Sequence, residues 1–371
     1  MRNKISTFFA SRPGIVFAGA TIGGLAALLV YAGNPPNMGI CIAGFLRDIG
    51  GALGFHREGA VQYIRPEIMG IVLGAFLTAR LFSEHRNRAT TLSLIPLILG
   101  TFAAIGALVF QGCPLRTLLR LAGGDLNALV GIAGFGLGVI IGVQLLKAGY
   151  TPGRTRQLPA YFSWLVPITM VGMLLLLIFR PRFAEDGPIF SSYVGTGSMH
   201  AAIWFSLGVG LLIGFLGQRT RFCIMGSLRD VALMRNTHLL SGALSLLVAA
   251  TVTNIFLGQI HVGFSNQPVV QNQHLWNFLG MVLVGIASAL AGGCPTRQLI
   301  LTGEGNGDAA YFILGMFGGG IIAHNFGLVS PCVSGPMEVT IGPSGMIAVA
   351  AGIVVCVWIG LRTRVDRDAS R

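Results

Sequence analysis

Long runs of apolar residues, separated by short polar segments, follow one another along almost the whole chain. A helix needs about 20 such residues to cross roughly 30 Å of hydrocarbon, and about ten runs are long enough. The predicted spans are roughly 14–33, 64–82, 91–111, 128–147, 159–180, 199–217, 239–257, 275–291, 308–327 and 343–361. Backbone polar groups find no water inside a bilayer, so we expect helices rather than a barrel to carry the crossings.

Four shorter apolar segments, marked by Gly and Pro, lie between these runs. They cover 37–55, 112–124, 219–234 and 293–305. Each is too short to cross a bilayer and too apolar for an ordinary loop, a pattern typical of re-entrant half-helices packed inside protein. The predicted fold class is an all-α polytopic membrane protein with about ten transmembrane helices and four half-helices.

Composition and charge agree with this pattern. Of the 371 residues, 53% are hydrophobic and 10% are charged, whereas soluble domains average about 25% charged residues. The net charge of +12 could indicate a nucleic-acid partner, but the basic residues are almost all arginines in short loops. With the N-terminus inside, most of these loops are cytoplasmic, and Arg180 and Arg182 are the main exceptions. We therefore predict an inner (plasma) membrane protein with both termini cytoplasmic and no nucleic-acid partner.

Two short motifs each occur twice, in the same order and at nearly the same offset. CIAGFLRDI (41–49) reappears as CIMGSLRDV (223–231), and GCPLRTLL (112–119) reappears as GCPTRQLI (293–300). This spacing indicates a duplicated chain. An odd number of predicted crossings, five, separates the copies, so the second copy is inverted, as in many transporters. The predicted units are a first repeat at 1–158, a linker span with an outer loop at 159–198, and a second, inverted repeat with a C-terminal span at 199–371.

Each GCPxR motif is expected to place a cysteine at the start of a short helix. Proline suits the first helical position, and the residue before it is driven out of the helical conformation. Cys113 and Cys294 should therefore be N-caps, where free N–H groups and the helix dipole favour an anion or a thiolate. The glycine before each cysteine allows backbone or ligand to approach closely. The predicted half-helix turns are Gly112, Pro114, Gly293 and Pro295.

Two inverted copies would aim these helix ends at a common centre from opposite sides. Cys41 and Cys223 begin the other repeated motif and add one thiol to each half. The predicted substrate pathway is Cys41, Cys113, Cys223 and Cys294. Arg116 and Arg297 either steer the substrate or snorkel and cap helices, and the sequence leaves both roles open.

Several other residues receive a plainer interpretation. Cys332 and Cys356 are taken as small hydrophobic residues. Arg47–Asp48 and Arg229–Asp230 are expected to be structural ion pairs, since an unpaired charge at membrane depth is costly. His324 is the one histidine kept as a candidate, and Glu67, Asp125 and Asp308 are the carboxylates that could serve a proton relay. None of the cysteine spacings is a CxxC, so no metal, cofactor or disulfide framework is predicted.

The motifs CIxGxLRD and GCPxR, in two copies each, resemble those of the YeeE/YedE family of sulphur-transport membrane proteins, over about residues 10–361. The run that begins NMGICIAGFLRDIGGALG is most similar to the selenium-transporter branch. The resemblance implies an hourglass-shaped inverted-repeat protein that carries a small sulphur compound such as thiosulphate into the cytoplasm. It also implies that the four repeated cysteines relay the anion, and that a soluble sulphur-carrier protein docks on the cytoplasmic side, where we expect segment 217–236 to receive it.

The leading hypothesis is a permease, not an enzyme, for a sulphur- or selenium-containing anion. A thiol suits a large polarizable sulphur or selenium atom better than a hydroxyl or carboxylate does. A second hypothesis is a membrane thiol oxidoreductase or persulphide transferase, in which a cysteine binds the substrate covalently. A third is a structural scaffold, in which the cysteines only pack.

Overall fold

The computed structural model describes residues 2–91, 94–159, 161–179, 182–184, 187–329 and 341–363. Helices make up most of this part of the chain. The long helices are α2 (Arg12–Tyr31), α4 (Pro66–Leu81), α5 (Leu94–Phe110), α7 (Asn127–Lys147), α8 (Phe162–Phe179), α9 (Ile203–Thr220), α11 (His238–Phe256), α12 (His274–Leu290), α14 (Gly307–Asn325) and α15 (Pro343–Arg362). The short helices are α1 (Arg2–Ala10), α3 (Ile42–Ala52), α6 (Pro114–Ala122), α10 (Ile224–Met234) and α13 (Pro295–Gly303).

Every predicted span coincides with one of the long helices, and every predicted half-helix contains a short one. Among the described residues, seven helical segments are long and apolar enough to cross a membrane, and three of these join a long helix to the half-helix that follows it. The all-α polytopic fold class is thus confirmed. The crossing count of ten stays a prediction, since α4, α8 and α14 are not among the seven.

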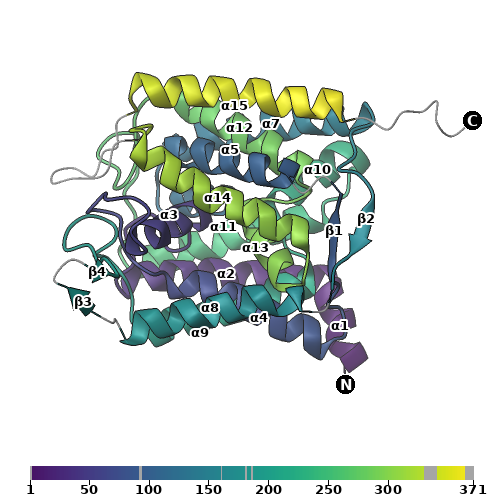
Figure 1. The fold of residues 1–371 in the computed structure, drawn as a ribbon, viewed down its shortest axis with the longest axis horizontal. Coiled ribbons are helices and arrows are strands. Elements are labelled where there is room, and N and C mark those ends of the chain that lie inside the picture. The colour runs from purple at the N-terminus through teal and green to yellow at the C-terminus, as the bar shows by residue number, and fades with distance from the viewer. Residues whose placement is uncertain are drawn as a thin grey trace, which may run out of the picture.

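The long helices run side by side along the longest axis of the molecule (Figure 1). Helix α2 packs along α11 and α4 along α9, while α5 packs along α14 and α7 along α12. If α2–α7 correspond to α9–α14, each of these contacts has a counterpart with the two halves exchanged. Helix α8 packs against α4, and α15 packs against α5, α7 and α12, outside this scheme. A chain that has been duplicated and inverted would produce such a pairing.

Small residues bring these helix pairs into close contact. A side-chain carbon on Gly70 would collide with Leu207 and Gly210 across the α4–α9 pair. Glycines at 134 and 138 of α7 and at 315 and 319 of α14 are equally close to their partner helices. Membrane helices associate through this kind of small-residue packing, because lipid offers no hydrophobic driving force between them. The glycine-rich runs of the sequence are therefore packing surfaces.

Apolar side chains also cover part of the outside of the bundle. Ile168 on α8 is 63% exposed, Leu314 on α14 is 54% exposed and Val354 on α15 is 68% exposed. Exposed apolar surface on this scale is typical of a protein that meets another apolar phase. These helices present the surface that lipid would contact.

The loops that carry arginine gather at one end of the bundle, which we call the arginine-rich face. There β1 (Arg88–Thr90) pairs with β2 (Thr155–Gln157) in antiparallel register, and Arg86 N–H donates to the carbonyl of Glu304. The end of α15 joins them, since Thr151 N–H donates to Thr363 O, and α1 lies at the same end (Figure 1).

The opposite face holds β3 (Arg182–Ala184) and β4 (Gly187–Pro188) together with the loops around 195–202 and 257–273. Among the outward-lying residues predicted earlier, Arg180 and Cys332 fall outside the described part of the chain. The first described helix and the end of α15 share the arginine-rich face, and its assignment to the cytoplasm remains a prediction.

Candidate substrate pathway

Each of the four half-helices begins directly after one of the repeated cysteines. Cys41, Cys113, Cys223 and Cys294 are the N-caps of α3, α6, α10 and α13, and all four have extended backbone conformations. The Sγ of Cys41 accepts a hydrogen bond from Gly44 N–H at 3.4 Å, and that of Cys223 accepts one from Gly226 N–H at 3.2 Å. Cys113 and Cys294, each followed by proline, make no side-chain cap.

The cysteines come together in two pairs, one from each half of the chain. In the first thiol pair, the side chains of Cys41 and Cys113 are in hydrogen-bonding contact. In the second thiol pair, the Sγ atoms of Cys223 and Cys294 are 3.8 Å apart, and Cys294 N lies 3.5 Å from Cys223 Sγ. All four are buried and free. Sequence spacing gave no sign of this pairing, because each pair joins residues about 70 positions apart.

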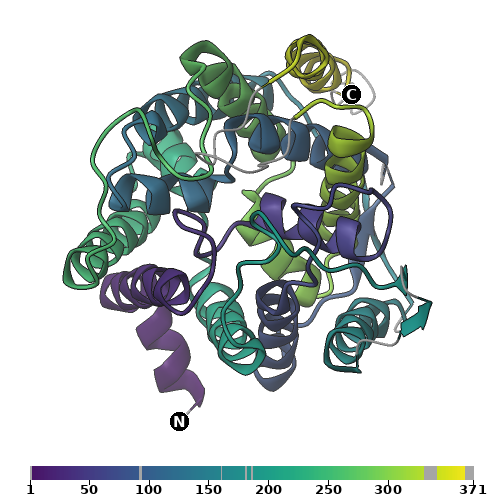
Figure 2. The same ribbon diagram turned by 90° about the vertical axis from the view of Figure 1, so that its left-hand side faces the viewer.

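The half-helices run away from the thiol pairs in opposite directions. The C-terminal end of α3 reaches the opposite face, where Ala52 O accepts from Phe190 N–H, and Gly123 after α6 accepts there from His261 N–H. The end of α13 instead reaches the arginine-rich face at Glu304. Figure 2 shows these short segments inside the ring of long helices. Positive helix ends therefore point into the protein interior from both sides.

The two candidate steering arginines make backbone and carboxylate contacts. Arg116 is almost completely buried, and its Nε and Nη2 donate to Asn37 O at 2.8 Å and Val269 O at 3.1 Å. Its guanidinium thus fixes the loop that leads from α2 to Cys41. Arg297 pairs with Glu304 at 2.9 Å at the arginine-rich face. Arg116 thus holds two loops and Arg297 forms an ion pair, and both arginines lie one helical turn from a pathway cysteine.

The predicted half-helix turns differ in one respect from expectation. Gly112 N–H and Gly293 N–H donate to Ala107 O and Ser288 O, closing the ends of α5 and α12. The left-handed residue of each turn is the preceding one, however, since Gln111 has φ 62° and Gly292 has φ 77°. Gln111 adopts this costly conformation while its Nε2 donates to Leu108 O, which offsets part of the strain. Proline at 114 and 295 occupies the first helical position in both copies.

Charged residues within the half-helices, or close to their C-terminal ends, form ion pairs. Arg47–Asp48 and Arg229–Asp230 are paired at 2.7 and 2.9 Å, as predicted. Arg65 also pairs with Asp48, at 2.8 Å, a contact that the sequence did not predict. A further buried pair joins Arg120 and Asp125 at 2.6 Å.

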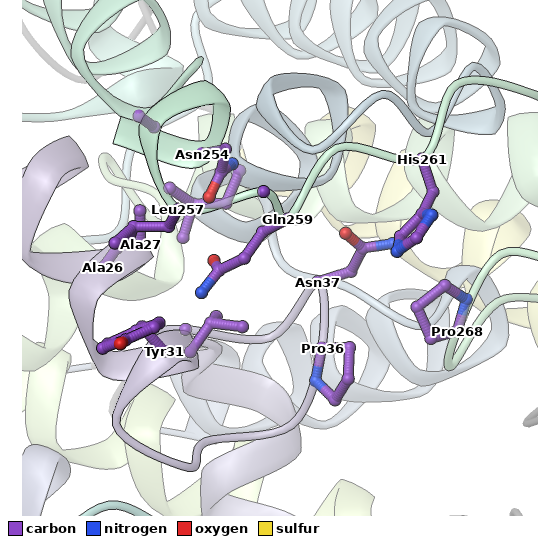
Figure 3. Close-up of a pocket in the computed structure, with 15 residues that line it drawn as sticks. Ala26, Ala27, Tyr31, Pro36, Asn37, Asn254, Leu257, Gln259, His261 and Pro268 are labelled. Atoms are coloured by element: carbon purple, nitrogen blue, oxygen red, sulfur yellow. The ribbon is translucent and has the colours of Figure 1, made fainter. Parts of the chain in front are cut away.

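A cavity of about 320 Å³ opens at the opposite face, and its lining includes Asn37, Gly39 and Leu119. Helices α2 and α11 form its walls, and the loops that carry Asn37 and His261 complete it (Figure 3). The carboxamide of Gln259 extends into it, and Asn254 lines it with its side chain buried. The loop that carries Asn37 and Gly39 continues to Cys41, so one loop contributes both to the lining of the cavity and to the first thiol pair.

Other candidates lie away from the thiol pairs. The ring of His324 stacks on His56 with centroids 4.9 Å apart, and burial lowers the pKa of His56. Cys356 is buried alone in α15. Within the described ranges, no cluster of three or more His, Cys, Asp or Glu side chains could hold a metal ion.

Comparison with known proteins finds a family match in the second half of the chain. Residues 219–365, which include the second thiol pair, match the family described as Sulphur transport. The second half of the chain is thus similar to the sulphur-transport family. Two thiosulphate transporters named TsuA are similar to part of this chain: that of Spirochaeta thermophila is 31% identical over 128 residues, and that of Escherichia coli is 32% identical over 108 residues. These alignments cover 34% and 29% of this chain and only 38% and 30% of the length of the two relatives.

Proposed function

We propose that this protein is a permease for a small sulphur- or selenium-containing compound, an anion such as thiosulphate or a selenium analogue. The observation that carries the proposal is the placement of two thiol pairs on inward-pointing helix ends, one pair from each half. Helix N-termini offer N–H donors and positive potential to an anion, and thiols offer soft contacts to its terminal sulphur or selenium. The names of the two relatives support thiosulphate. The selenium branch rests on sequence resemblance alone.

Buried thiols suit passage better than tight binding. A thiol is a weak hydrogen-bond donor, so it can hold an anion in a dry interior without retaining it as a lysine or arginine would. Conduction requires that binding be favourable enough for entry and weak enough for release. In this proposal the anion enters through the cavity beside Asn37 and passes from the first thiol pair to the second. Cys41, Cys113, Cys223 and Cys294 then each contact it in turn.

The proposed architecture has a repeat boundary near 158 and a second repeat from 199 onward, with α8 as the linker. The arginine-rich face is placed in the cytoplasm of a cell with an inner membrane. A sulphur-carrier protein would dock there on segment 217–236, where Arg221, Met234 and Arg235 are exposed. Exposed basic and apolar side chains side by side are typical of a protein-binding surface.

The test is uptake into liposomes that contain the purified protein. We expect labelled thiosulphate, labelled selenite or both to enter with the wild type, and the Cys113→Ala/Cys294→Ala variant to lose uptake. These two cysteines do not cap their helices, so their removal should leave the fold intact. Cys356→Ala removes an equally buried thiol outside the pathway and should transport normally. Uptake that persists in the double variant would contradict the thiol pathway.

One observation favours a second candidate, sulphur transfer: the 3.8 Å separation of Cys223 and Cys294 Sγ. A thiolate at this pair could attack the outer sulphur of thiosulphate, forming a cysteine persulphide, while sulphite leaves with the electron pair of the broken S–S bond. The neighbouring thiol could then receive the sulphur. Intact-mass spectrometry distinguishes the two functions, because transfer adds one sulphur atom to the protein and releases sulphite, whereas permeation does neither.

A further inference from the structure

Glu67 is a buried carboxyl group that the proposed thiol pathway does not use. It occupies the first turn of α4 and is 1% exposed. Its Oε1 accepts a hydrogen bond from Asn34 Nδ2 at 2.8 Å, and its Oε2 has no partner among the described residues. No ion pair to Glu67 is formed in that part of the chain. An ionisable side chain buried in protein without a counter-ion is expensive to keep, and it is a candidate for a functional role.

The elements packed around Glu67 bring few other charges. Helix α9 carries no charged residue before Arg219, at its far end, and α2 carries none after Arg12, with Tyr31 at its near end. Arg65, at the N-cap of α4, is committed to Asp48, which also pairs with Arg47 on α3. His200 stacks on Tyr63, which precedes Glu67 by four residues, and Cys41 follows Gly39, another partner of Asn34, by two residues.

Hydrogen bonds connect Glu67 to the loop that leads to Cys41 of the first thiol pair. Asn34 Nδ2 also donates to Gly39 O at 3.0 Å, and its Oδ1 accepts from Ala201 N–H at 2.9 Å. Gly39 lies two residues before Cys41. Asn34 therefore closes the loop between α2 and α3, and it does so with Glu67 as its partner. A carboxylate accepts this bond more strongly than a neutral acid does, so protonation changes how firmly the loop is held.

We infer that Glu67 is the proton-binding site of a proton-coupled anion permease, an inference that rests on the proposed function. A negative Glu67 and an incoming anion repel one another in the same dry interior, and a proton on Glu67 removes that repulsion. Anion and proton then favour each other's binding to an equal extent, as linkage requires. One proton carried with each anion lets the pH gradient across the membrane drive uptake.

The experiment uses the whole protein in liposomes, with thiosulphate as the probe, because thiosulphate stays a dianion near neutral pH. With the membrane potential clamped at zero and the outside one pH unit more acidic, coupling to one proton gives about tenfold accumulation. A pH-sensitive dye inside the vesicles should report acidification on addition of thiosulphate. Glu67→Gln keeps the acceptor for Asn34 and cannot titrate, so it should equilibrate thiosulphate without accumulation or acidification.

Glu58→Gln is the matched control, since it neutralises a carboxyl on the same face that is not fully buried. It should accumulate thiosulphate as the wild type does. Uptake by the wild type without acidification would overturn the coupling and leave the permease standing, even if Glu67→Gln failed to fold. A wild-type response retained in Glu67→Gln would overturn the role of Glu67. No uptake under any gradient would reject the permease, and the coupling with it.

Discussion

The LRD motif occurs once in each half of the chain, and its ion pair lies in a different environment each time. In the first half, Arg47 and Asp48 are 4% and 0% exposed and are joined by Arg65. In the second half, Arg229 and Asp230 are 32% and 14% exposed, and within the described residues they form ion pairs only with each other. The same local sequence therefore gives a dry three-residue cluster at one face and a hydrated pair at the other. The energetic weight of a repeated motif depends on what surrounds it.

The largest expected effect comes from breaking the dry cluster. Asp48→Asn leaves Arg47 and Arg65 buried without a counter-charge, which should lower the free energy of unfolding by about 3–5 kcal/mol. The equivalent change Asp230→Asn should cost less than about 1 kcal/mol, because water solvates the remaining arginine. Thermal unfolding of both variants in the same detergent measures the difference. Equal losses of stability would show that the two environments are alike.

The two thiol pairs offer the next comparison. In the permease proposal they act in series, so Cys113→Ala and Cys294→Ala should each slow uptake, by about tenfold if each removes one hydrogen bond to a charged group. Initial rates of thiosulphate uptake in liposomes test this. A loss confined to one of the variants would show that only one half carries the pathway.

A smaller effect is expected from oxidation of the second thiol pair. Its Sγ atoms are 3.8 Å apart, so a short movement would allow a disulfide between Cys223 and Cys294. A mild thiol oxidant should therefore partly block uptake in the wild type, and dithiothreitol should restore it. Cys223→Ala should resist the block when its uptake rate is compared before and after oxidation. An irreversible fall of that rate on oxidation would point to damage elsewhere.

The smallest effects should come from two carboxylates at the arginine-rich face that respond oppositely to pH. For Glu84, burial raises the pKa, but hydrogen bonds from Gln218 and Arg219 outweigh it and leave the pKa lowered. Its contribution to stability is present above the ordinary glutamate pKa of about 4.3 and is lost as pH falls through the folded value. For Glu304, burial raises the pKa despite its partner Arg297, so its contribution is lost as pH rises through that value.

Unfolding midpoints of Glu84→Gln and Glu304→Gln across this pH range provide the measurement. The first variant should lose less stability in acid than the wild type. The second should lose less as the pH rises toward neutrality. The same pH trend in both variants would contradict the assignment.

Much of the architecture could be predicted from the sequence, because hydrophobic run length is set by bilayer thickness. The half-helices were also predictable, since Gly and Pro mark their starts, and the structure places a cysteine at each N-cap. The pairing of the thiols and the contacts of Arg65 and Arg120 were not. These contacts join residues that are distant in the sequence or that lie at the end of a helix. A hydropathy pattern does not show which side chains contact one another. The left-handed Gln111 was missed because only its neighbour is a glycine.

The sulphur caps of α3 and α10 have a consequence for the orientation of their thiols. The Sγ of Cys41 turns its lone pairs toward Gly44 N–H, and the Sγ of Cys223 turns its own toward Gly226 N–H. The hydrogen on each sulphur must then point away from its helix. Each of these half-helices therefore contributes its own dipole and also fixes the direction of the S–H bond dipole of its N-cap cysteine. Alanine at Cys41 or Cys223 would remove the dipole and fray the helix start together, whereas at Cys113 or Cys294 it would remove only the thiol.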